Sequence, residues 1–206
     1  MVVRHCRSAA LVLGLIAVAA DPALAHHMMG GRTPATFGEG ILSGLGHPVI
    51  GIDHLAFLVA VGVAVGIARL SLLMPAIFVL ASAVGVAVHV AGITIPAAEL
   101  IVALSVILVG ATIARGAALA PIVWAGLFAI AGLFHGYAYG ESIFGAEATP
   151  LWAYLAGLVV IQTALACGVA VVAQRYQAST ALAPRLLGAA VFGIGLAVLA
   201  QQVLPG

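Results

Sequence analysis

The chain has 206 residues, of which 65% are hydrophobic and only 6% are charged. A soluble domain carries about 25% charged residues, so this composition excludes a soluble protein and indicates an integral membrane protein whose immediate partner is the lipid bilayer. Seven arginines, no lysine and six acidic residues give a net charge of +1, which excludes a basic face for nucleic acid. The two cysteines, Cys6 and Cys167, exclude a thiolate metal cluster, so histidine, carboxylate, methionine or backbone groups would have to hold any metal.

The first 25 residues have the pattern of a secretory signal peptide. Arg4 and Arg7 precede an apolar stretch over 9–20, and small residues follow up to Ala25. Twelve residues rise only about 18 Å as a helix, which is less than the ~30 Å hydrocarbon core of a membrane. We therefore expect cleavage after Ala25, with an uncleaved short anchor as the alternative.

Cleavage would leave an N-terminal segment over residues 26–46 on the outer, periplasmic side, beginning with His26 and His27. The new α-amine, the two imidazoles and the two methionines that follow could bind a divalent transition metal arriving from outside. A disordered polar tail is the alternative interpretation. We expect the glycine-rich residues 30–46 to form a short ordered or re-entrant approach to the first membrane span.

The rest of the chain predicts an all-α, polytopic bundle, with a six-helix transmembrane domain over residues 47–206. Its apolar segments are each about 18 to 23 residues long, enough to cross a membrane: 49–68, 72–93, 97–114, 120–139, 151–173 and 186–203. If the first span starts on the outer side, the odd loops lie in the cytoplasm. These loops carry four arginines, as the positive-inside rule requires: Arg69, Arg115, Arg175 and Arg185.

Most potential nitrogen and oxygen ligands fall at the predicted outer ends of the spans. They are His47, Asp53 and His54 at the first span, His89 at the second, Glu99 at the third, and His135 and Glu141 at the fourth. Ionisable groups beside hydrocarbon are costly and usually mark function. Because imidazole and carboxylate bind transition metals, this layer predicts an uptake site for a divalent cation. The structural alternative is that His47 caps a helix, Asp53 accepts a hydrogen bond and His54 packs in the core.

The spacing within each cluster limits how its members could act together. On an unbroken helix His47 and His54 share a face but lie about 10 Å apart along the axis, too far for one ion bound at about 2.1 Å. Either the helix is broken between them, which Pro48 and Gly51 would permit, or the two histidines serve successive positions along a path. The cluster over 134–141 leaves the same alternatives, because two of its glycines could break the helix.

Both clusters carry a family resemblance. Residues 47–54 fit an H-x5-D-H pattern, and residues 134–141 fit F-H-G-x-A-x-G-E. With these motifs and the expected topology, the chain resembles the HupE/UreJ family of bacterial nickel permeases. The third span adds the family-like pattern Pro96-x-x-Glu99, with Ser105 and Gly110. The chain departs from the family where Phe57-Leu58 replaces a frequent methionine and Tyr139 replaces a frequent histidine.

The resemblance implies a secondary permease, and no enzyme, in the bacterial inner membrane. It would import Ni²⁺, with Co²⁺ as the alternative, and supply hydrogenase or urease maturation. The metal would be cargo, and no prosthetic group is implied. From the residues themselves, we expect the outer metal site to be formed by His47, Asp53 and His54. His135 and Glu141 would join this site across the bundle, with Glu99 and His89 in support. Whether copies of the chain form a homo-oligomer stays open.

Two other classes of function stay open. In the first, an intramembrane zinc-dependent hydrolase, a carboxylate such as Glu141 would activate water, although no HExxH motif is present. In the second, a non-transporting membrane accessory protein would assist metalloenzyme assembly. The chain contains no G-x-x-x-x-G-K-[ST] phosphate loop, so direct use of ATP is not expected.

Overall fold

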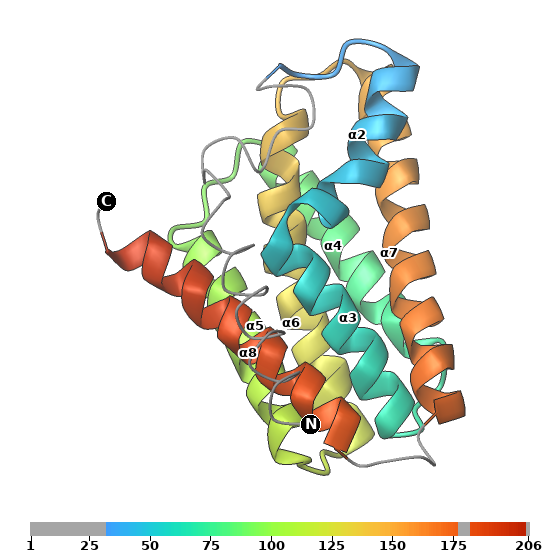
Figure 1. Cartoon of the computed structure of the whole chain (residues 1–206). Helices are drawn as coiled ribbons and strands as arrows, with labels where there is room; N and C mark the ends of the chain where they lie inside the picture. Colours follow the sequence, from blue (N-terminus) through green and yellow to red (C-terminus); the bar gives the residue numbers. More distant parts are fainter. Residues whose placement is uncertain (1–31, 177–181, 205–206) are drawn as a thin grey trace, which may run out of the picture.

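The structure, a computed structural model, describes residues 32–176 and 182–204. The predicted signal peptide, His26 and His27 lie outside the described residues. Within the described part the chain is entirely helical, with no strand, which confirms the all-α class (Figure 1). The elements are α2 (Phe37–Ile50), α3 (Ile52–Ile67), α4 (Met74–Val90), α5 (Ala98–Arg115), α6 (Pro121–Gly140), the short 3-10 helix η1 (Glu141–Ile143), α7 (Ala148–Tyr176) and α8 (Leu182–Val203).

Four of the described helices are long and apolar enough to cross a membrane by themselves: α5, α6 with η1, α7 and α8. The helices α2 and α3 pass the same test only as a pair, bent by 77° at the break between them, which brings the number to five. Helix α4 is apolar but has only 17 residues. Length and composition therefore establish a multi-pass membrane protein with four or five candidate spans in the described residues.

The first helix begins earlier than the first predicted span. A capping box sets its start, because the Thr36 hydroxyl accepts from the Glu39 backbone N–H and the Glu39 carboxylate accepts from the Thr36 N–H at 3.1 Å. The stretch expected to be a short ordered or re-entrant approach is thus largely the helix α2. This helix packs along the first turns of α7, where Gly40 lies against Pro150 and Ala153.

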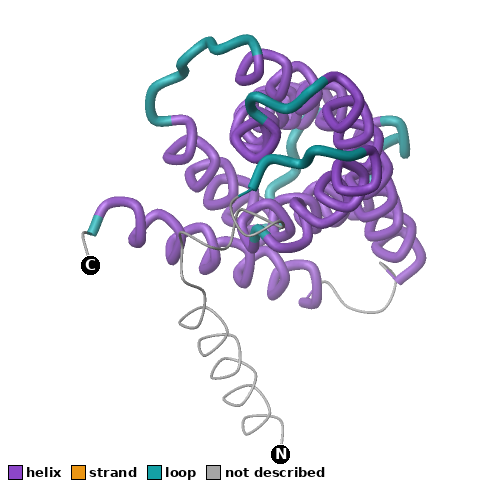
Figure 2. Tube along the Cα trace, turned by 90° about the horizontal axis from the view of Figure 1, so that it is seen from above, coloured by secondary structure: helices purple, strands orange, loops and turns teal. Residues whose placement is uncertain are grey.

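The helices run up and down between two ends of the bundle (Figure 1). We call the upper end in that view the His47 end; it holds α2, the α4–α5 connection and the α6–α7 connection. The lower, Arg69 end holds the connections after α3 and α5 and the start of α8. Helices α4 and α6 pack closely against each other, as do α5 and α8. Seen along the bundle, the helices gather around one axis, and the C-terminal helix α8 lies at the side of the bundle (Figure 2).

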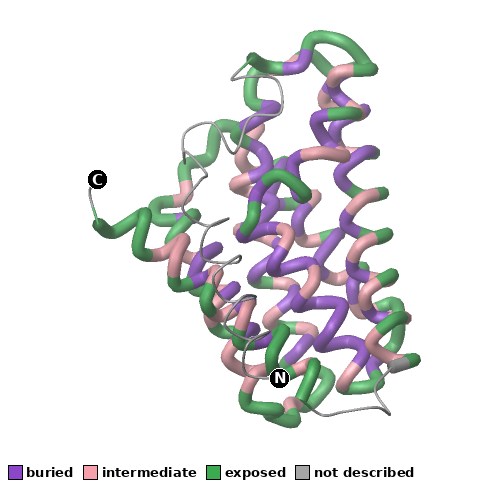
Figure 3. Tube along the Cα trace, viewed as in Figure 1, coloured by how far each residue is buried: buried purple, intermediate pink, exposed green. Residues whose placement is uncertain are grey.

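Buried residues line the inner faces of the helices and exposed residues lie on the outer faces (Figure 3). Many of the exposed residues are large and apolar. Ile122 and Leu80, for example, are 78% and 68% exposed. A soluble protein would place polar residues there, whereas lipid accepts such a surface. The interior has a main core around Phe57 and Phe78 and a separate upper core at the His47 end, formed by Val86, Tyr139, Ile143, Tyr154 and Leu158.

Glycines on α6 permit the close approach of this helix to α4. Substitution of these glycines tests how tightly the two helices pack. A methyl group added at Gly132 would lie 2.5 Å from the Phe78 carbonyl oxygen and 2.9 Å from the Ala81 Cβ, whereas one at Gly126 would meet nothing within 4 Å. We expect Gly132→Ala to lower the thermal stability of the detergent-solubilised protein by roughly 1–3 kcal/mol, the usual cost of overpacking. Gly126→Ala in the same helix is the control and should be neutral or stabilising. Equal melting temperatures for the two variants would contradict this packing.

Candidate metal site

A helix break at Gly51 decides how the first cluster is arranged. Pro48 lies inside α2, where it removes one backbone donor, and Gly51 adopts an extended conformation that ends α2 and caps α3. A side chain at Gly51 would collide with the His54 ring, since an added Cβ would lie 2.6 Å from its Cδ2. The 77° bend brings the ring centroids of His47 and His54 to 5.8 Å. Of the two alternatives left open by the spacing, the structure has the broken helix.

The centre of the site is a direct contact between two histidines from different helices. His54 at the start of α3 and His135 near the end of α6 lie with their Nδ1 atoms 2.9 Å apart. Both are almost completely buried, with 1% and 0% of their surface exposed. Phe57 and Phe78 cover the inner side of the His135 ring, with ring centroids 4.5 and 5.7 Å away. The two histidines therefore occupy a closed position inside the bundle.

The hydrogen bonds around His135 favour the tautomer with its proton on Nε2. The Ser105 hydroxyl donates to the Val102 carbonyl at 2.7 Å, so it accepts from the Nε2–H of His135 at 2.9 Å. With its proton on Nε2, neutral His135 presents the lone pair of Nδ1 to His54. His54 then donates its own Nδ1–H across the 2.9 Å contact. Ser105 on α5 thus orients His135, as partners in the outer shell of a metal site commonly do.

The third histidine, His47, is held by two hydroxyl groups about 100 positions later in the chain. Its Nδ1 lies 3.0 Å from the Ser142 Oγ and 3.1 Å from the Tyr154 hydroxyl. Both hydroxyls also reach the Tyr139 carbonyl, at 3.1 and 2.8 Å. When both donate there, they accept the proton on His47 Nδ1, and the lone pair of the ring is on Nε2. The helices α2, α6 and α7 and the turn η1 are joined through this network.

The Tyr139 ring lies beside both histidines of the first cluster. Its centroid is 4.3 Å from the His54 ring and 5.1 Å from the His47 ring. The side chain is fully buried, and its hydroxyl has no hydrogen-bond partner among the described residues. A buried hydroxyl without a partner is costly, so this group is available to a ligand that enters the site.

The spacing of the histidine pair suits two ligands of one metal ion once the proton of His54 has moved from Nδ1 to Nε2, which frees the second lone pair. Two nitrogens bound at about 2.1 Å and at a right angle to each other would lie about 3.0 Å apart, close to the observed separation of the Nδ1 atoms. Asp53 is adjacent and buried, with its Oδ1 accepting from the His54 backbone N–H at 2.8 Å. As the side chains stand, the described ranges contain no group of three or more His, Cys, Asp or Glu side chains arranged to hold a metal. Binding would therefore need a side-chain movement that adds a third ligand.

The remaining predicted ligands lie elsewhere at the His47 end. Helix α6 is unbroken from Pro121 to Gly140, so Glu141 does not come back to His135. Instead, Glu141, Glu99 and His89 line a separate cavity of about 370 Å³ with Tyr137, which we call the acidic cavity. Both glutamates are exposed, and His89 is half-buried with its Nδ1 lacking a hydrogen-bond partner among the described residues. The predicted layer of seven ligands is thus divided between a buried histidine site and an acidic cavity.

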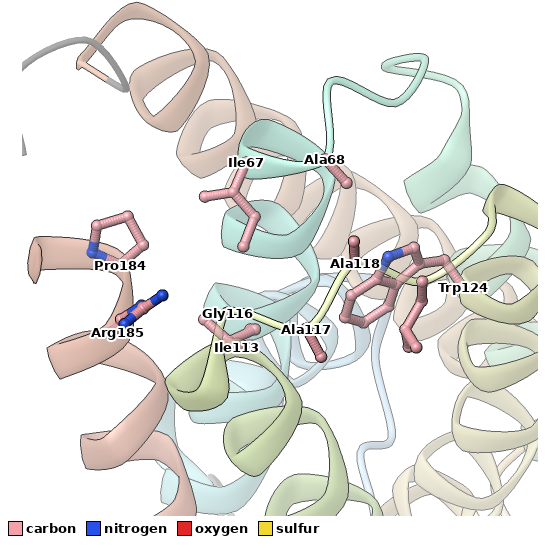
Figure 4. Close-up of a pocket in the computed structure, with 10 residues that line it drawn as sticks. Ile67, Ala68, Ile113, Gly116, Ala117, Ala118, Trp124, Pro184 and Arg185 are labelled. Atoms are coloured by element: carbon pink, nitrogen blue, oxygen red, sulfur yellow. The ribbon is translucent and has the colours of Figure 1, made fainter. Parts of the chain in front are cut away.

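A different cavity lies at the Arg69 end, between the ends of α3 and α5 and the starts of α6 and α8 (Figure 4). It has a volume of about 400 Å³, with Pro184 and Arg185 on one side and Trp124 on the other. Its lining contains no imidazole or carboxylate, so it is not a candidate for binding a transition metal.

The two hydroxyl partners of His47, Ser142 and Tyr154, were not predicted from the sequence. Ser142 directly follows Glu141, and Tyr154 lies on α7, 107 positions after His47. No local spacing links these residues, and their roles follow from how α7 packs against α2. Gln162 was a candidate for a hydrogen bond between helices, but its partner Ser82 was not predicted, since the two residues are 80 positions apart.

Comparison with known proteins gives an independent result. Residues 13–198 match the model of the family described as HupE / UreJ protein. Protein HupE of Rhizobium leguminosarum bv. viciae is 30% identical over 187 residues, which cover 89% of this chain and 94% of that protein. No solved structure gives a significant match. Since the family match contains both histidine clusters and nearly the whole bundle, the chain belongs to the HupE/UreJ family.

Proposed function

We propose that this chain is a permease that imports Ni²⁺, with Co²⁺ as the alternative cargo, across the bacterial inner membrane for hydrogenase or urease maturation. The observation that carries the proposal is the buried contact between His54 and His135, whose Nδ1 atoms lie 2.9 Å apart inside a multi-pass helical protein. Imidazole is a common ligand of nickel and cobalt. Family membership supports the metal and the metalloenzymes named here.

In the proposed topology the chain crosses the membrane six times, through α3 to α8, with α2 entering at the outer side. The mature N-terminus is periplasmic after removal of residues 1–25. The arginines support this orientation, because Arg69, Arg115, Arg175 and Arg185 all belong to the connections at one end of the bundle or to the helix ends beside them. The His47 end is then periplasmic and the Arg69 end is cytoplasmic.

In the proposed path the acidic cavity collects the cation and the buried histidines select it. Glu99 and Glu141 are exposed, so they attract cations from solution without a large cost of desolvation. Within the bundle, His54 and His135 bind the dehydrated ion, and Asp53 or His47 turns to supply the third ligand. His26 and His27 are proposed to hold metal ahead of the cavity.

The membrane potential is a sufficient energy source for this transport. Each charge moved across about 100 mV gains about 2.3 kcal/mol, so a divalent cation gains about 4.6 kcal/mol. That free energy corresponds to roughly thousandfold accumulation inside the cell. The proposal therefore requires neither ATP nor a coupled ion.

Loss of either buried imidazole tests the proposal most directly. We expect His54→Ala and His135→Ala to lower uptake of labelled Ni²⁺ into proteoliposomes by roughly 10- to 100-fold, because each removes one of two adjoining ligands. Thr112→Val is the matched control, since within the described residues this α5 hydroxyl bonds to its own helix, at the Leu108 carbonyl. Uptake at the wild-type rate in both histidine variants would disprove the assignment, and absence of flux with the wild-type protein would favour the accessory class.

The pH dependence follows from the need for neutral imidazole. Protonation occupies the nitrogen lone pair that binds metal, so acid should weaken binding. We expect the initial rate of uptake, at a fixed membrane potential, to fall as the outer pH is lowered from about 7.5 to about 5.5. A rate that rises over this range would show that imidazole ligation does not limit uptake.

The acidic cavity should act on cation capture more than on the transport step. We expect the double variant Glu99→Gln, Glu141→Gln to raise the metal concentration for half-maximal uptake roughly tenfold while the maximal rate changes little. Glu147→Gln is the control, because this exposed carboxylate lies at the same end but does not line the cavity. A lower maximal rate at unchanged half-saturation would instead place the glutamates in the transport step.

A further inference from the structure

A second buried polar contact lies close to the histidine pair and has no part in the hydrogen-bond networks around the three histidines. The Ser82 hydroxyl of α4 lies 2.9 Å from the Gln162 Oε1 of α7. These side chains are 1% and 0% exposed, so neither reaches lipid or solvent. A carboxamide is rarely buried in a membrane bundle without a reason, because its polar atoms have no water to bind.

One end of the carboxamide has no partner in either possible orientation. As placed, Gln162 accepts from Ser82 and its Nε2 has no hydrogen-bond partner among the described residues. Ser82 also lies 3.0 Å from the Val79 carbonyl, to which its single proton can be donated instead. The Gln162 amide would then turn to donate through Nε2, and its Oε1 would be left without a partner. The site therefore has unused hydrogen-bonding capacity in the middle of the bundle.

The register of the helices places this contact beside the histidine pair, with its α7 end about one turn farther from the His47 end. Helices α3 and α7 run in the same direction, with Gly62 against Ala166 and Gly66 against Ala170. Counting back one turn sets Gln162 level with the residue at position 58, one turn or about 5 Å farther from the His47 end than His54. On the opposite side of the bundle, Ser82 packs against Gly136, so the α4 end of the contact lies level with His135.

Ser82 and Gln162 also mark the boundary between the two cores. On α4, Ser82 lies between Val79 of the main core and Val86 of the upper core. On α7, Gln162 lies between Leu158 of the upper core and Ala166 of the main core. A cation that leaves the histidines toward the Arg69 end meets the apolar main core, and Gln162 is a buried polar group at the edge of that core.

We infer that Gln162, held by Ser82, is the next binding position on the path and supplies a carboxamide oxygen to the divalent cation after it leaves His54 and His135. This inference rests on the proposed transport function. Transport requires that an ion leave its tightest site, and a weaker neutral oxygen ligand one turn away provides an intermediate step. Because the group is neutral, it does not trap the ion as a second carboxylate would.

The test compares labelled Ni²⁺ uptake by proteoliposomes with equilibrium Ni²⁺ binding to the same purified variants. We expect Gln162→Met, similar in size but without the carboxamide, to retain Ni²⁺ affinity and lower the maximal uptake rate by about tenfold. Gln162→Asn keeps a neutral carboxamide oxygen and should restore part of the rate. Thr163→Val is the matched control, because the adjacent Thr163 is exposed on the outer face of α7.

A purely structural role has a different signature. If the contact only joins α4 to α7, Gln162→Met will transport at the wild-type rate per folded molecule whatever its melting temperature, and that result overturns the inference. If Gln162→Met does not fold, the uptake rate of Ser82→Ala is measured in its place. We expect Ser82→Ala to lower the maximal uptake rate, and an unchanged rate would contradict the inference. Normal uptake by Gln162→Met with loss in His54→Ala would overturn this inference alone, whereas an inactive wild-type protein would overturn the proposed function together with it.

Discussion

The contact between His54 and His135 is the interaction on which the arrangement of the site depends. Each imidazole would be costly to bury alone, but together with Ser105 they satisfy one another across three helices. The two imidazoles bridge α3 and α6, which do not pack closely against each other, in the region where polar groups are concentrated. Phe57 and Phe78 close the contact on the inner side. It therefore fixes the orientation of a nitrogen pair before any ion arrives, which lowers the cost of ordering ligands around an ion.

The helix break at Gly51 brings the third histidine, His47, to the site. Because α2 turns by 77° away from α3, His47 lies near His54 and does not stand a full two turns beyond it along one axis. The hydroxyls of Ser142 and Tyr154 then hold His47 from α7 and the turn before it. Irregular backbone at membrane depth is tolerated where it is buried in protein, and here the tyrosines of the upper core surround it.

Charge and polarity change in steps along the bundle. Exposed carboxylates stand at the His47 end, neutral imidazoles follow inside it, and the neutral Ser82–Gln162 contact lies at the boundary of the main core. Four of the five arginines in the described residues are found at the opposite end: Arg69, Arg115, Arg175 and Arg185. An ion moving inward would thus meet ligands of decreasing charge, and the membrane potential would act in the same direction.

From the sequence alone, the membrane class, the helical fold, the family and the identity of the buried histidines could be predicted, because hydropathy and motif spacing are local properties. Spacing also limited the first cluster to two arrangements. Packing decided between them: Pro48 weakens the helix before Gly51, whereas Gly136 and Gly140 serve the close approach of α4 and leave α6 unbroken. Because α6 is unbroken, Glu141 lies apart from His135. The partners of His47 and Gln162, in turn, come from 80 or more positions away in the sequence. Such contacts arise only when separate helices meet, so the tertiary structure alone determined them.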